Sequence, residues 1–153
     1  MIRGSRLVTI LIAGTLFIVA AVGGLVAAAT ASTVADPSRG EAAMELGGEA
    51  GRGLLVRFEI LPRPVKPLSD LVLIVTLSRA GKALVDAEVQ VDLTMPAMFM
   101  GKNRPVLKHV GEGRYEGKAV LPRCMSGDKR WQAEILVKEG GGEARAIFPF
   151  ELP

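Results

Sequence analysis

A strict alternation of apolar and polar residues from Val85 to Thr94 constrains the fold more than any other feature of the chain. Every second side chain of a strand shares one face, so this pattern predicts a strand with one buried side. The same period recurs from Gly53 onward. Pro149 lies within the last alternating run, which predicts an edge strand or a bulge there. The expected strands are 54–60, 70–78, 84–94, 105–109, 114–121, 130–138 and 143–152.

These runs predict an all-β domain over residues 53–153, a seven-stranded antiparallel immunoglobulin-like β-sandwich. If successive strands are antiparallel, the connections between them alternate between the two ends of the sandwich. Short glycine-bearing turns then share one end, and longer proline-bearing loops share the other. The longer loops are 61–69, 95–104 and 122–129, and we call the end that they form the loop pole.

An uncharged apolar segment runs from Leu7 to Ala29, behind Arg3 and Arg6. Its length fits a membrane span, so residues 1–31 are expected to form a signal-anchor or transmembrane helix. Cleavage after Ala31 is the alternative. In either case the domain is expected on the extracytoplasmic, periplasmic side; with an uncleaved anchor it is held there by a single pass through the cytoplasmic membrane.

Residues 32–52 are rich in Ala, Gly, Glu and Ser without a sustained period, which predicts a flexible tether. The strand expected at 54–60 begins at the end opposite the loop pole. The tether is therefore expected to arrive at that end, with the loop pole facing away from the membrane.

Several classes of function find no support in the sequence. The net charge is only +3, and no basic stripe or aromatic platform suggests nucleic-acid binding. Cys124 is the only cysteine, so no internal disulfide can form. No nucleophile–base pair, carboxylate dyad or phosphate loop is present, so we expect a binding protein and no enzyme.

Sulfur is concentrated at the expected loop pole. Met95, Met98 and Met100 lie within six residues, and Cys124 lies in the loop 122–129, followed by Met125 as a reserve donor. Thioether and thiolate sulfurs suit Cu(I), so these four residues are candidate metal ligands. The neighbouring Arg123 and Lys129 would favour the thiolate form of Cys124. His109, the only histidine, is expected near the tight-turn end.

Two other interpretations of these residues stay open. Methionine often fills gaps in a core, so the loop can simply plug the end of the sandwich. The same flexible side chains, mixed with basic residues, also suit a metal-free surface for docking a partner protein.

Three short motifs resemble those of YtkA-like and FixH-like domains. They are the loop Met95-Pro-Ala-Met98-Phe-Met100-Gly101, the strand entry Gly113-Arg-Tyr115-Glu-Gly117 and the element Ser126-Gly127 to Trp131. The resemblance covers most of 53–152. It implies a small exported immunoglobulin-like domain concerned with copper handling and with assembly of membrane cytochrome oxidases. A membrane oxidase or an exported copper protein is the implied partner. Many YtkA-like members carry histidine where this chain has Lys102.

Overall fold

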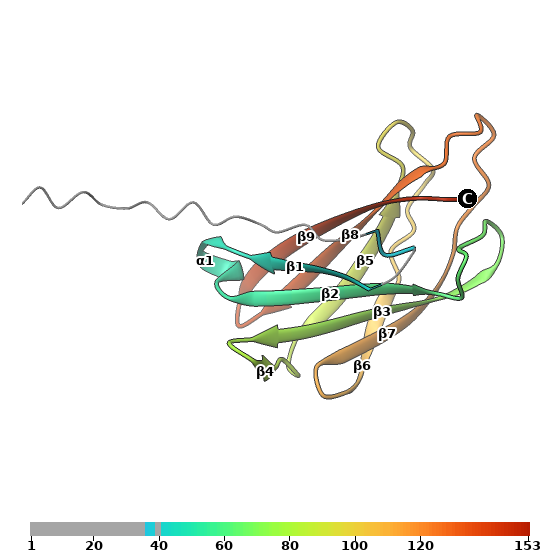
Figure 1. The fold of residues 1–153 in the computed structure, drawn as a ribbon. Helices are drawn as coiled ribbons and strands as arrows, with labels where there is room; N and C mark the ends of the chain where they lie inside the picture. The colour runs from blue at the N-terminus through green and yellow to red at the C-terminus, as the bar shows by residue number, and fades with distance from the viewer. Residues whose placement is uncertain (1–35, 39–40) are drawn as a thin grey trace, which may run out of the picture.

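The computed structural model describes residues 36–38 and 41–153, which form an all-β, antiparallel domain (Figure 1). Its only helix in that part of the chain is α1 (Gly48–Gly51). Within the same residues, no helix has the length and apolar character that a bilayer span requires. The helix expected over 1–31 lies outside the described residues.

The strands make one nearly closed, sandwich-like sheet in the order β1-β2-β3-β7-β6-β5-β8-β9, with β4 paired to β3. Their bounds are β1 (Ala42–Leu46), β2 (Leu54–Leu61), β3 (Asp70–Arg79), β4 (Lys82–Ala83), β5 (Glu88–Thr94), β6 (Val106–Gly111), β7 (Arg114–Val120), β8 (Arg130–Glu139) and β9 (Gly142–Glu151).

Strand β6 joins two layers whose strands cross at an angle in Figure 1. Its first residues pair with β5, and the residues from Lys108 onward pair with β7. Phe58 of β2 meets Phe148 of β9 between the layers, with ring centroids 5.7 Å apart. The end strand β1 and helix α1 also lie against β9, which brings the sheet close to a barrel.

The expected strand faces are confirmed where the apolar alternation was strongest. The inward residues of β2, Leu54, Val56, Phe58 and Ile60, are all fully buried, as are Trp131 and its neighbours on β8. Strand β9 lies at the end of the strand order, so one of its edges has no neighbouring strand in that order. Proline lacks a backbone N–H, and an edge strand tolerates this loss, which agrees with the position of Pro149.

The strand expected over 84–94 is shorter than predicted, since β5 begins at Glu88. The Tyr115 hydroxyl explains the difference. It donates to the carbonyl of Leu84 at 3.0 Å and accepts the amide N–H of Ala87 at 3.2 Å. These backbone groups are therefore held by a side chain of β7 and do not extend the β5 ladder.

The count of seven strands is also wrong, because the structure adds β1 and the two-residue β4. Strand β1 lies within the range expected to be a tether. Its residues Ala42 and Met44 are buried in the core, and it pairs antiparallel with β2.

This extra strand reverses the direction from which the chain enters the domain. Because β1 runs antiparallel to β2, the chain reaches it from the side of the loop pole. The Ser38 hydroxyl donates to the carbonyl of Glu151 at 3.3 Å, and Glu151 pairs with Arg130 at the start of β8. The expectation that the chain arrives at the end opposite the loop pole is therefore wrong for the described residues.

Candidate functional site

The three long loops meet at one end of the domain, as strand parity predicted, and lie on the same side of the molecule in Figure 1. The amide N–H of Leu68 donates to the carbonyl of Leu121 at 2.8 Å. The side-chain amide of Asn103 donates to the carbonyl of Val120 at 3.0 Å. Backbone and side-chain hydrogen bonds thus tie the first two loops to the end of β7, where the third begins.

The methionine loop is closed by an isolated antiparallel bridge between Met95 and Met98. Met95 is only 4% exposed and belongs to the core, whereas Met98 is 41% exposed. Met100 is partly buried against the core. The three methionines are among the residues 94–101 that line one open hollow of about 330 Å³. The structure therefore brings three of the four predicted ligands around a single space.

Cys124 is half-buried and packs against the core from the neighbouring loop. Its Sγ lies 2.9 Å from the hydroxyl oxygen of Ser126. This hydrogen bond is the main reason that the pKa of Cys124 is lowered, and the backbone N–H groups of Ser126 and Asp128 add to it. The expected effect of Arg123 and Lys129 is not among the causes. The sequence thus indicated an acidic thiol but attributed it to the wrong neighbours.

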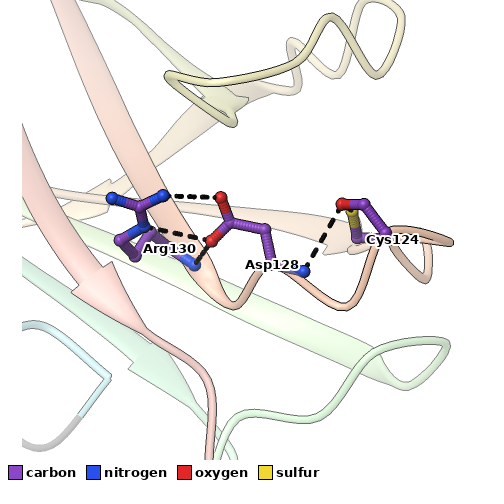
Figure 2. A network of polar contacts seen from close by, with 4 residues as sticks. Cys124, Asp128 and Arg130 are labelled. Atoms are coloured by element: carbon purple, nitrogen blue, oxygen red, sulfur yellow. Dashed lines mark hydrogen bonds and ion pairs between the residues drawn. The ribbon is translucent and has the colours of Figure 1, made fainter.

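Asp128 fixes the shape of the loop that carries Cys124 (Figure 2). Its carboxylate accepts the backbone N–H of Arg130 at 3.0 Å and a two-pronged contact from the Arg130 guanidinium at 3.1 and 2.9 Å. These bonds lower the pKa of Asp128 to about 2. The loop is therefore braced at the start of β8 by a carboxylate that stays charged at neutral pH.

Cys124 does not line the methionine hollow. Its loop meets the methionine loop at a second pocket of about 250 Å³, between Pro96 and Ala97 on one side and Asp128 and Arg130 on the other. Met125, the reserve donor, is 93% exposed. Among the described residues, no group of three or more His, Cys, Asp or Glu side chains could hold a metal ion.

His109 lies on β6 beside the turn 111–113, at the other end of the domain. Its ring packs against Tyr115 with centroids 5.0 Å apart. Lys102 is exposed on the methionine loop.

Sequence reasoning missed two features of the loop pole. Leu68 and Phe99 expose large apolar side chains, 64% and 84% respectively, on two of the three long loops. Asp92 is buried on the outer face of β5, where Arg104 donates from Nε to its Oδ2 at 2.5 Å. The apolar loop positions could have been noted from Pro67-Leu68 and Met98-Phe99, but the burial of Asp92 has no local signal.

Comparison with known proteins gives one match. A family model described as YtkA-like matches residues 55–135, which run from β2 into β8 and include the methionine loop and Cys124. No curated protein and no solved structure matches the chain.

Proposed function

The chain belongs to the YtkA-like family, and from that premise we propose that it is a membrane-tethered extracytoplasmic binding module that handles Cu(I) at its loop pole. Met95, Met98, Met100 and Cys124 are the proposed ligands. The role is binding and delivery, without catalysis, and the receiving partner is a membrane cytochrome oxidase under assembly or an exported copper protein.

One observation supports this proposal above the others: all three methionines of the loop are among the residues that line the same hollow. Thioether sulfur is a soft donor that favours Cu(I) over Zn²⁺ or Mg²⁺. Met95 supplies a ligand from a rigid core position, while Met98 is accessible from solvent. A site with one anchored and one exposed thioether suits a metal that must be taken up and handed on.

Cys124 is the proposed fourth ligand. The Ser126 hydroxyl lowers its pKa, so the thiolate forms more readily than in a free cysteine. A thiolate would balance the charge of Cu(I), which three neutral thioethers cannot do. Since Cys124 lies on the adjoining loop, its approach to the hollow requires the loops 95–104 and 122–129 to close on the ion.

The strand order also supports the finer fold assignment within this proposal. One layer contains β2, β3, β7 and β6, and the other contains β5, β8 and β9. Numbered from β2 without β4, this is the arrangement of the two sheets of an immunoglobulin constant-type domain. Export, an N-terminal anchor over 1–31 and kinship with FixH-like domains belong to the same proposal.

A Cu(I) competition titration against a coloured chelator tests the metal proposal. We expect the unaltered protein to compete, and Met98→Leu, Met100→Leu and Cys124→Ser each to weaken binding at least tenfold. Leucine preserves volume, so loss of binding would report the sulfur and not the packing. Met125→Leu is the matched control on the neighbouring loop. Equal, weak binding by all five proteins would refute the proposal.

A metal-free docking module is the second candidate. The exposure of Phe99 favours it, because a large aromatic ring in solvent has no role in holding copper. Under that alternative, Phe99→Ser would abolish crosslinking from Cys124 to a neighbour, whereas Met98→Leu would leave it unchanged. Under the copper proposal, the metal-binding defect would instead follow Met98.

A further inference from the structure

Each of the three long loops exposes an apolar side chain at the loop pole. Leu68 projects from the first loop, Phe99 from the second and Met125 from the third, all more than half exposed. Met98 adds to the set. Exposed apolar side chains on three loops at one end of the domain differ from single apolar residues scattered over strands, and exposed apolar surface concentrated in this way marks interaction surfaces.

The same loops carry a concentrated positive charge. Residues 61–69, 95–104 and 122–129 contain six basic side chains and one acidic side chain, which gives a formal charge of +5, against +3 for the whole chain. Four of the basic residues form no ion pair within the described part of the chain, namely Lys66, Lys102, Arg123 and Lys129, and all four are exposed. Asp128, the one acid, is already paired with Arg130. The surface is therefore suited to an anionic partner.

The described part of the chain enters the domain at the loop-pole end. Ser38 contacts Glu151 at the loop-pole end of β9. Asp36 lies seven positions after Ala29, the last residue of the apolar run, and a fully extended chain of seven residues spans at most about 25 Å. If the segment is anchored, the loop pole is the end of the domain held close to the bilayer.

We propose that the loop pole docks on the membrane surface, with an anionic lipid bilayer as its partner. Leu68, Phe99 and Met125 enter the boundary between headgroups and acyl chains, as the apolar residues of interfacial segments do. The unpaired lysines and arginine contact lipid phosphates, because an anionic surface attracts basic side chains that lie near it. The inference rests on the tether of the proposed function but not on copper.

This orientation places the methionine hollow and Cys124 at the membrane. Copper held there would be presented to a bilayer-embedded acceptor at the level of the headgroups. A protein acceptor could also use apolar and basic side chains, but the entry of the chain at this end of the domain favours the lipid surface as the partner of this face.

Environment-sensitive labelling of the full chain in lipid nanodiscs tests the inference. A fluorophore is attached to Met125→Cys, or to Val110→Cys as the matched control, both in a Cys124→Ser background without copper. Val110 is exposed on β6 at the opposite end of the domain. We expect the label at 125 to shift to the blue and to be quenched several-fold by spin-labelled lipid when the discs contain phosphatidylglycerol. The label at 110 should be unaffected.

Salt and charge reversal provide the second arm. Added salt and the double variant Lys66→Glu/Arg123→Glu should reduce quenching at 125, because both weaken attraction to the lipid phosphates. Lys82→Glu on β4 is the matched control and should not change it. If the chain stays in the discs but quenching is equal at the two positions, or is absent at 125, the docking inference is wrong while the proposed tether stands. A chain that leaves the discs would overturn the tether and this inference together.

Discussion

Met95 and Met98 face each other across a single antiparallel bridge, closed by the Met98 amide N–H donating to the Met95 carbonyl at 3.3 Å. This bridge gives two methionines three residues apart opposite environments, because Met95 turns into the core and Met98 toward solvent. Because Met95 also packs in the core, its sulfur would be a well-fixed donor to a bound metal ion. Mutation can separate the contribution of Met95 to packing from its proposed contribution to metal binding.

Met95→Ala should lower the free energy of unfolding by about 2–4 kcal/mol, because it leaves a cavity under the loop. Met98→Ala should change it by less than about 0.5 kcal/mol, as is usual for an exposed site. Denaturant unfolding measures both. Met95→Leu is the control that restores volume without sulfur, and it should recover most of the loss. Similar costs for the two alanine variants would contradict the buried position of Met95.

The acidity of Cys124 should depend on Ser126. Ser126→Ala removes the principal hydrogen bond that lowers the thiol pKa, so the pKa should rise. Alkylation by iodoacetamide follows the thiolate, and its rate profile should therefore move to higher pH in this variant. Ser126→Thr keeps the hydroxyl and serves as the control. Arg123→Ala should not change the dependence of the alkylation rate on pH. A shift as large as that of Ser126→Ala would show that the positive charge of Arg123, and not the Ser126 hydroxyl, lowers the thiol pKa.

Tyr115 should stabilise the connection between β3 and β5 through its hydroxyl. Tyr115→Phe leaves the carbonyl of Leu84 and the amide of Ala87 without this partner, which should cost about 1–3 kcal/mol. The Ala87 amide should then exchange with solvent faster, while the amide of Val91 within the β5 ladder changes only with global stability. Unchanged protection at Ala87 would show that the hydroxyl is dispensable.

The same connection explains one of the family-like motifs. Gly113 has φ +73°, and a Cβ there would lie 2.5 Å from the carbonyl oxygen of Leu77 and 3.1 Å from the amide of Leu84. Two residues later, Tyr115 bonds to Leu84 from the same strand entry. The Gly113-Arg-Tyr115 motif is therefore a structural clamp, and its presence supports the fold without bearing on the ligand.

Sequence pattern predicted those parts of the fold that depend on local alternation. The faces of β2, β8 and β9 follow from alternation of buried apolar residues with more polar ones, and burial on one face needs no other information. Strand β1 was missed because Ala42–Leu46 consists of residues that favour helices, so its strand character comes from pairing with β2. The segment 84–87 was wrongly predicted as strand. Its residues alternate well, but the Tyr115 hydroxyl forms hydrogen bonds with the Leu84 carbonyl and the Ala87 amide, which are then not available to the β5 ladder.

The candidate site was predictable to the level of loops and not of side chains. Loops 95–104 and 122–129 were expected at one end because the chain reverses direction between successive strands. Every second connection therefore lies at the same end of the domain. Which methionine turns inward depends on the Met95–Met98 bridge, which spacing cannot reveal. The side from which the chain enters depends on β1, so missing that strand also inverted the expected orientation of the loop pole.

Acid should loosen the loop that carries Cys124 through Asp128. The pKa of Asp128 falls from 3.8 to about 2, chiefly because of hydrogen bonds from Arg130. A carboxylate with a depressed pKa in the folded state stabilises that state above its unfolded pKa, and the stabilisation is lost as pH falls through the folded value. The contribution should therefore be complete above about pH 4 and disappear between about pH 4 and pH 2. Asp128→Asn should lack this dependence.

Two-dimensional NMR across that pH range checks the prediction through the backbone amide of Arg130, which donates to Asp128. In the unaltered chain its resonance should shift with a midpoint near pH 2, and Asp70→Asn, which removes an exposed carboxylate at the start of β3, should not alter that midpoint. A midpoint near 4 would show that the Arg130 contact is not maintained in solution.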